Sequence, residues 1–131
     1  MNFLGKYEEH TYALFRMMAG FLFVWHGTQK LFDFPTAFPF GPLNAMTGAA
    51  GVIELVGGIL IMVGLLTRPA AFICSGTMAV AYWMAHGLNS FFPLVNHGEL
   101  AAFYCFAFLF IAAKGAGMWS VDRQMASAGD S

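Results

Sequence analysis

Four long apolar stretches constrain the fold of this chain more than any other feature of its sequence. Each is close to the ~20 residues that an α-helix needs to cross the hydrocarbon core of a bilayer. They run over residues 11–31, 46–66, 69–88 and 98–118. Between the first two, Pro35, Pro39 and Pro42 prevent a continuous helix and indicate a segment at the membrane interface, either a simple anchor or a gate. The pattern predicts an all-α integral membrane four-helix bundle, in one domain over residues 1–131.

The composition agrees with this class. Hydrophobic residues make up 59% of the chain and charged residues 10%, well below the ~25% charged residues of soluble domains. The net charge of -1 and the absence of a Lys/Arg run argue against nucleic acid as a partner. The first apolar stretch contains Arg16 and lacks a small-residue cleavage site, so we expect it to be retained as a membrane helix.

The few basic residues predict the orientation. Lys6 precedes the first stretch, Arg68 lies between the second and third, and Arg123 follows the fourth. With four crossings, all three fall on one side of the membrane, whereas the other side has Lys30 at a helix border. The positive-inside rule then places both termini in the cytoplasm.

Seven polar residues in or beside the apolar stretches form the candidate pocket. A charged group in the bilayer core costs at least ~2.5–3.5 kcal/mol, so each such residue needs a partner or a cavity. Small residues share their helical faces: Gly20 and Gly27 in the first stretch, Gly51 and Gly58 in the second. The candidates are therefore expected to point into the bundle. They are Arg16, His26, Lys30, Glu54, His86, Asn96 and Glu99.

The predicted depths of these residues suggest a pocket that opens to the outer side. Glu54 would lie about 12 Å inward from the start of its helix, at the pocket floor. Arg16 lies in the inner half, from which it would reach toward Glu54 or extend to the cytoplasmic headgroups. Structural roles stay open beside the functional ones. Glu54 can pair with Arg16 or Lys30 to fix the helix register, and Asn96 can cap the fourth helix.

Cys74 and Cys105 are expected to be free packing residues. Cys74 is predicted near the inner face and Cys105 in the outer half, about 10 Å apart along the membrane normal and beyond disulfide reach. His26, His86 and a carboxylate are possible metal ligands, but they lie on separate stretches with no local His pair. We therefore expect no metal site.

Three segments resemble the DoxX family of small membrane proteins. RMMAGFLFVWHGTQKLF (Arg16 to Phe32) is similar to the first helix of that family, and GVIELVGGILIMVGLLTRPAA (Gly51 to Ala71) to the second. NHGELAAFYCFAFLFIAAKGAGMWSVD, which begins at Asn96, is similar to the fourth, although His97 stands where a small residue is expected. The resemblance covers nearly the whole chain. It implies a four-helix bundle in a bacterial cytoplasmic (inner) membrane.

The resemblance also implies a functional context, because some members look like subunits of thiosulfate:quinone oxidoreductases or partners of other membrane redox proteins. The first hypothesis is thus a redox subunit with a quinone as its cofactor, in which His26 or Glu54 transfers protons and Lys30 or Arg16 binds the quinone oxygen. With no dinucleotide fingerprint or cysteine cluster in the sequence, electrons would come from a partner. The alternatives are a non-enzymatic membrane scaffold and a small-molecule carrier. Catalytic residues are not assigned, and a homo-oligomer is one further expectation.

Overall fold

Helices make up the regular structure of the chain. The computed structural model describes residues 2–129, and no strand occurs in that range. The all-α class predicted from the sequence is confirmed. In chain order the elements are η1 (Gly5–Tyr7), α1 (Glu8–Phe32), α2 (Ala45–Val63), α3 (Thr67–Tyr82), the π-helical turn η2 (Trp83–Gly87), α4 (Pro93–Asn96), α5 (Glu99–Lys114) and α6 (Val121–Gly129).

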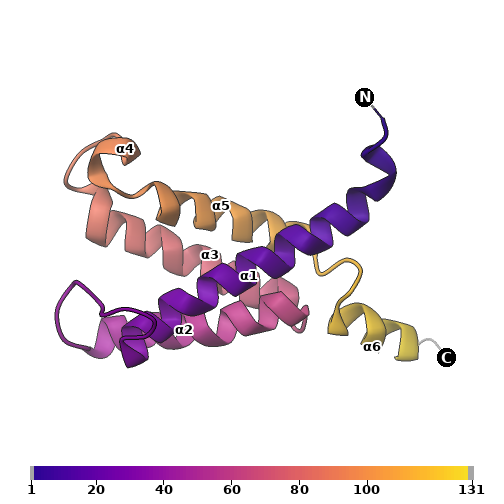
Figure 1. The fold of residues 1–131 in the computed structure, drawn as a ribbon, viewed down its shortest axis with the longest axis horizontal. Coiled ribbons are helices and arrows are strands. Elements are labelled where there is room, and N and C mark those ends of the chain that lie inside the picture. Colours follow the sequence, from indigo (N-terminus) through magenta and orange to yellow (C-terminus); the bar gives the residue numbers. More distant parts are fainter. Residues whose placement is uncertain (1, 130–131) are drawn as a thin grey trace.

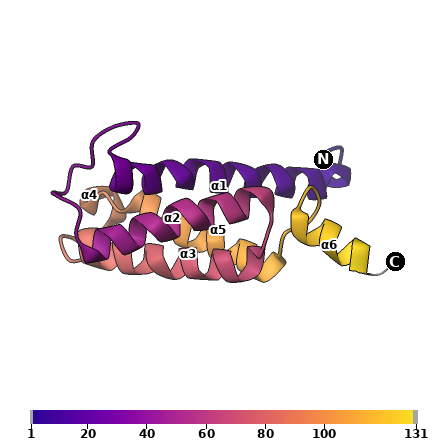
Figure 2. The same ribbon diagram turned by 90° about the horizontal axis from the view of Figure 1, so that it is seen from below.

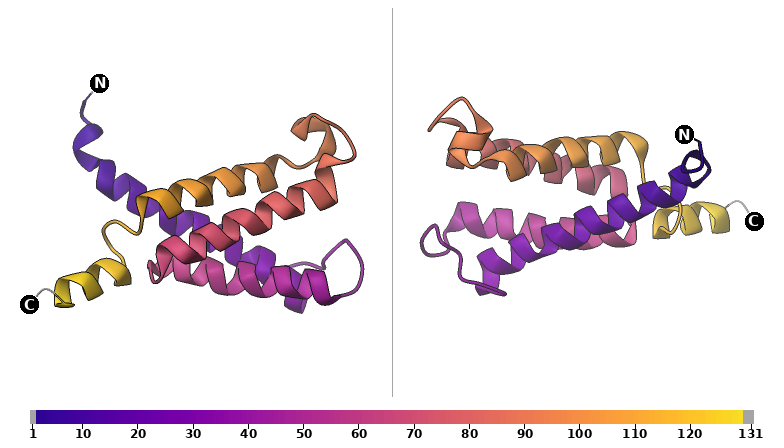
Figure 3. Two further views of the ribbon diagram at one scale, coloured as in Figure 1. Left: turned by 180° about the vertical axis from the view of Figure 1, so that it is seen from behind. Right: turned by 45° about the horizontal axis from the view of Figure 1, so that its top comes forward.

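The four long helices form two pairs. α1 packs along α2, α3 packs along α5, and contacts between α2 and α3 join the pairs. Figure 1 shows the pairs diverging toward the end that carries α4, and Figure 2 shows α1 along one face of the other three helices. The N-terminus, the α2–α3 turn and α6 lie at the opposite end (Figure 3). We call these the loop end and the terminal end.

The predicted helix boundaries need correction at several points. α1 begins at Glu8, before residue 11, and α5 ends at Lys114 rather than residue 118. Gly115 ends α5 with a φ of 93°, a positive value that glycine adopts without steric cost. Neither α4 nor α6 was expected, because a four-residue helix and a short polar helix leave no long apolar pattern.

The four long helices differ in length and in the number of charged residues that they carry. Among the described residues, α2 is the one helix that is both long and apolar enough to cross a membrane by itself. α1 carries charged residues near both ends, and α3 and α5 have 16 residues each. The π-helical turn η2 continues α3 toward the loop end. A five-residue π segment is rare, and such segments recur at functional sites. The segment therefore favours a functional site near the loop end.

Glycines set the close approach of α1 and α2. A Cβ at Gly27 would lie 2.5 Å from the Leu55 backbone nitrogen, and one at Gly20 would lie 2.6 Å from the Gly58 carbonyl oxygen. Both glycines are buried, on the face that also carries Arg16 and Phe23. The small-residue faces predicted from the sequence are therefore the faces in contact, and they bring the polar residues of both helices together.

Gly27→Ala is expected to destabilise the bundle by about 1–3 kcal/mol, because the added methyl group meets backbone atoms that cannot move aside. Gly76→Ala is the matched control. Nothing lies within 4 Å of a Cβ at Gly76, in α3, so this change should be neutral or slightly stabilising. Thermal unfolding in a mild detergent compares the two variants. An equal loss of stability in the two variants would contradict the close α1–α2 contact.

An aromatic cluster joins the two helix pairs. Phe23 of α1 and Phe108 of α5 are fully buried with ring centroids 4.7 Å apart. Tyr104 stacks on Phe108 at 5.5 Å and lies 5.1 Å from Phe23. This cluster fixes α5 against α1 and places Tyr104 beside the loop-end half of α1.

Side chains from distant segments tie the terminal end together. The Asp122 carboxylate accepts hydrogen bonds from the Leu66 and Thr67 backbone N–H groups, each at 2.9 Å, and so caps α3. Arg68 donates to the last carbonyls of α5, those of Ala112, Ala113 and Lys114. Burial by itself would raise the pKa of Asp122, but these hydrogen bonds and the nearby Arg16 charge outweigh it and lower the pKa.

Asp122→Asn is expected to lower the stability by about 1 kcal/mol near neutral pH, the usual cost of a lost helix cap. In this variant the NH₂ group of the amide would face one of the two backbone N–H donors, and it cannot accept a hydrogen bond from that donor. The pKa of Asp122 is lower in the folded chain than in the unfolded chain. The carboxylate therefore contributes its full stabilisation at pH values above the unfolded pKa. That contribution is lost as the pH falls through the folded value. Unfolding curves of wild type and variant should therefore converge in acid. A pH-independent gap, or an equal loss in the exposed control Glu9→Gln, would contradict this role.

Candidate functional site

An ion pair joins α1 to α2 inside the bundle. Lys30 Nζ lies 3.0 Å from Glu54 Oε1, with 17% of the lysine side chain and 2% of the glutamate side chain exposed. Lys30 belongs to the last turn of α1, and Glu54 faces it from the middle of α2. Gly51 leaves the room for this pair, because a Cβ there would lie 3.1 Å from the Lys30 Cβ. We call this pair, with the neighbours described next, the Lys30–Glu54 site.

The second carboxylate oxygen of Glu54 has no partner. Glu54 Oε2 is buried and receives no hydrogen bond from any described residue. A buried acceptor without a donor costs roughly 1–3 kcal/mol, and more when it is charged. Oε2 is thus a buried acceptor that no described residue serves, and a ligand that carries a hydrogen-bond donor would satisfy it.

Three further side chains surround the pair. The His26 ring, one turn before Lys30, meets the Tyr104 ring edge-on with centroids 5.7 Å apart. Cys74 of α3 approaches α2 next to Glu54, with its Sγ 4.0 Å from the Ile53 carbonyl, and Tyr104 of α5 packs against Phe23 of α1. Within residues 2–129, neither the His26 ring nor the Tyr104 hydroxyl makes a hydrogen bond. The site therefore combines an ammonium, an imidazole, a phenol and a free carboxylate oxygen.

The loop over residues 33–44 covers the lysine side of the site. The Phe38 ring lies 5.4 Å from Lys30 Nζ, in a cation–π arrangement. The loop folds back on α1 because the Thr28 hydroxyl donates to the Phe34 carbonyl at 2.8 Å and Gln29 donates to the Ala37 carbonyl at 3.2 Å. The proline-rich segment thus lies at the approach to Lys30 from the loop end.

His86 and Asn96 form a second, separate cluster. His86 Nδ1 lies 3.0 Å from the Asn96 carbonyl oxygen. The Asn96 amide donates to the Tyr82 hydroxyl at 3.1 Å and to the Ser90 carbonyl at 2.9 Å, and its oxygen accepts from the Gly98 N–H at 2.8 Å. These bonds close the turn between η2 and α5. Asn96 was predicted as a pocket residue or a cap, and its observed contacts are those of a residue that holds this turn together.

Arg16 does not reach Glu54, which corrects the expectation that the two pair. The side chain is fully buried at the terminal end. Its guanidinium donates to backbone carbonyls of the α2 C-terminus and of the segment that leads to α6. The acceptors are Ile61 at 3.0 Å, Met62 at 3.5 Å, Ala116, Met118 at 3.0 Å and Trp119 at 2.8 Å. Arg16 is thus a structural clamp.

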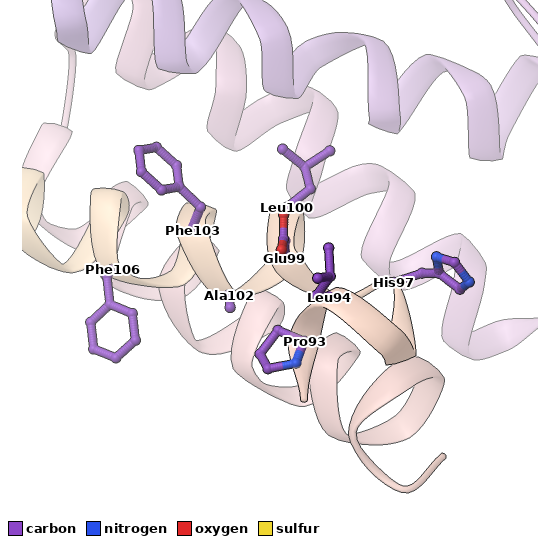
Figure 4. Close-up of a pocket in the computed structure, with 8 residues that line it drawn as sticks. All are labelled: Pro93, Leu94, His97, Glu99, Leu100, Ala102, Phe103 and Phe106. Carbon is purple, nitrogen blue, oxygen red and sulfur yellow. The ribbon is translucent and has the colours of Figure 1, made fainter. Parts of the chain in front are cut away.

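Glu99 lies outside the bundle interior. Its side chain is exposed and borders an open groove between the α4 segment and α5. Figure 4 shows this groove, with Pro93, Leu94 and His97 from the α4 segment and Phe103 and Phe106 along α5. Of the seven predicted pocket residues, the structure therefore brings His26, Lys30 and Glu54 together and places the other four elsewhere.

The two cysteines are free, but the predicted separation in depth is wrong. The Ser75 hydroxyl, next to Cys74 in the chain, donates to the Cys105 carbonyl at 2.7 Å, so both cysteines lie at a similar depth. Instead, the two side chains belong to different helix contacts. Cys74 Sγ faces α2, 4.0 Å from the Ile53 carbonyl, whereas Cys105 belongs to the α3–α5 contact.

Tyr104 was not predicted as a site residue, although the sequence carries a signal for it. Tyr104 carries a hydroxyl inside a run of Phe and Ala, and a polar group in an apolar helix is expected to face the protein interior. For metal ions, the described residues bring together no group of three His, Cys, Asp or Glu side chains.

The fold and the site together define a small helical bundle with an ion pair and a buried acceptor in its interior. The DoxX family model matches residues 11–87, which include most of α1, all of α2 and α3, and the Lys30–Glu54 pair. A Haemophilus influenzae protein described only as uncharacterized is 42% identical over 132 residues, covering 95% of this chain and 97% of its own length. No solved structure matches. The chain belongs to the DoxX family, as its sequence predicted, and this membership supports a membrane protein.

Proposed function

We propose that the chain is a multi-pass protein of a bacterial cytoplasmic membrane and a quinone-binding subunit or partner of a membrane redox system. The observation that carries the proposal is Glu54 Oε2, a buried carboxylate oxygen without a donor, beside the ammonium of Lys30. The membrane setting is supported by the 59% hydrophobic composition, the apolar helix α2 and the family membership.

The proposed orientation is supported by the common position of the basic residues near both termini. Lys6, Arg68 and Arg123 belong to η1, the first turn of α3 and α6, all at the terminal end (Figure 1). The positive-inside rule puts this end in the cytoplasm. Lys30 and the loop over residues 33–44 then face the outer side, and a ligand approaches the site from that half of the membrane.

The functional groups of the site are those that a quinone headgroup requires. Such a group, when bound, supplies two-electron redox chemistry coupled to two protons. Lys30 Nζ and His26 are donors for a carbonyl oxygen, and Glu54 Oε2 is an acceptor for the hydroxyl of the reduced form. Tyr104 and Phe38 supply aromatic walls. In this arrangement His26 and Glu54 hold protons at the ligand, while electrons come from a partner protein.

The first test is to purify the protein in mild detergent and extract its bound small molecules for mass spectrometry and visible absorbance. We expect near-stoichiometric quinone in the wild type and loss of most of it in Glu54→Gln, whose amide removes the acceptor charge. Glu99→Gln is the control, because it makes the same chemical change outside the site. Quinone retained equally by Glu54→Gln, or absent from the wild type, would contradict the proposal.

A membrane scaffold is the second candidate, favoured by the apolar surface of the loop end. Leu88, Phe91 and Leu94 are 83%, 85% and 75% exposed around the turn before α5. α5 itself spans about 24 Å, shorter than the ~30 Å hydrocarbon core, and a short helix is accommodated by local thinning or by association with another protein. A co-purifying membrane partner with no bound quinone would support this candidate instead.

A further inference from the structure

The groove between α4 and α5 has two chemically different ends. It is open, with a volume of about 820 Å³, and it lies apart from the Lys30–Glu54 site. His97 and Glu99 stand at its loop end, and the remaining lining is apolar: Pro93, Leu94, Leu100, Ala102, Phe103 and Phe106 (Figure 4). Phe103 and Phe106 lie about 6 and 10 Å farther along α5 than Glu99, at 1.5 Å per residue. A ligand that matches both ends is an amphiphile, with its polar group at Glu99 and its chain along the phenylalanines.

The charge at the polar end of the groove indicates which class of amphiphile the groove would bind. The Glu99 carboxylate makes no ion pair and no hydrogen bond with any described residue, and neither does the His97 ring. An unpaired carboxylate at the rim of an apolar groove attracts a cation that donates hydrogen bonds, and it repels an anionic headgroup. The imidazole of His97, two residues away, is available as a donor to a phosphate oxygen.

We propose that this groove binds a phospholipid whose headgroup carries a primary ammonium, such as phosphatidylethanolamine. The ammonium pairs with Glu99, the phosphate accepts a hydrogen bond from His97, and one acyl chain lies against Phe103 and Phe106. The inference rests on the membrane placement of the proposed function. In that placement, Glu99 belongs to the loop end and therefore to the headgroup level of the outer leaflet.

Native mass spectrometry of the delipidated protein tests the selectivity. The protein is incubated with equal amounts of phosphatidylethanolamine, phosphatidylcholine and phosphatidylglycerol that carry identical acyl chains. Phosphatidylethanolamine is expected to be retained about tenfold better than the other two, a ratio equivalent to ~1.4 kcal/mol. The comparison with phosphatidylcholine is decisive, because its quaternary ammonium has the same charge but no N–H donor. Equal retention of all three lipids would mean unselective surface lipid and would overturn the inference.

Two variants locate the binding. Glu99→Gln should reduce the retention of phosphatidylethanolamine to that of phosphatidylcholine, whereas Glu9→Gln, an exposed glutamate on α1, should leave it unchanged. Ala102→Phe fills the groove and should weaken all three lipids together. Unchanged selectivity in Glu99→Gln would overturn the inference, as would a quinone, rather than a phospholipid, displaced by Ala102→Phe. Both residues lie outside the Lys30–Glu54 site, so loss of quinone in Glu54→Gln remains a separate result.

Discussion

Arg16→Met is expected to destabilise the protein by at least ~4 kcal/mol, because several buried carbonyls lose a charged donor at once. The fully buried guanidinium ties the C-terminus of α2 to the segment that leads to α6, and no other described side chain donates to these carbonyls. Methionine fills a similar volume but donates nothing. The measurement is thermal or chemical unfolding of the purified protein in mild detergent, followed by circular dichroism.

Two further variants separate charge from geometry at this position. Arg16→Lys keeps the charge but lacks the planar fork that serves carbonyls on two segments, so it should recover a minor part of the lost stability. Arg123→Met removes the same charge from an exposed residue at the same end of the bundle and should change little. If Arg16→Lys were as stable as the wild type, the clamp would depend on charge alone and the hydrogen bonds would not be its basis.

Lys30→Met is expected to cost about 3–5 kcal/mol, because it leaves the Glu54 carboxylate charged, buried and unpaired. The double variant Lys30→Met, Glu54→Gln should be clearly more stable than Lys30→Met alone, since no buried charge remains. A double-mutant cycle measures this coupling, which we expect to be roughly 1–3 kcal/mol. Lys6→Met, at an exposed position, is the control for the loss of a lysine. Strict additivity of the two substitutions would show that the ion pair contributes nothing to stability.

The buried faces of α1 and α2 could be predicted from the sequence because two signals agree. Gly20 and Gly27 share a face with Arg16, Gly51 and Gly58 share one with Glu54, and both faces are buried in the α1–α2 contact. Such a buried face depends only on the helical periodicity and on the sizes of residues within one helix. The ends of the helices were harder to predict, because they depend on distant partners. The start of α3, for example, is capped by Asp122, 55 residues farther along the chain.

The candidate site could be predicted in part, for a related reason. The position of a residue along its own helix follows from the residue number, but the shift and the rotation of one helix pair relative to the other do not. His26, Lys30 and Glu54 belong to one pair and meet, whereas His86 and Asn96 belong to the other and form their own cluster. Glu99 has the predicted position at the start of its helix but faces outward. For Arg16, three of the carbonyls that it binds belong to residues 116–119, most of which were predicted to lie in the fourth helix rather than in the segment after α5.

The most direct test of the proposed function is photoaffinity labelling with an azidoquinone, followed by mapping of the labelled peptides. The proposal predicts labelling within residues 26–30 and 51–58, which contain His26, Lys30 and Glu54, with competition by unmodified quinone and strong reduction in Glu54→Gln. Labelling confined to residues 93–103, in the groove between α4 and α5, would contradict the proposed location. Labelling that no excess of quinone suppresses would contradict quinone binding itself.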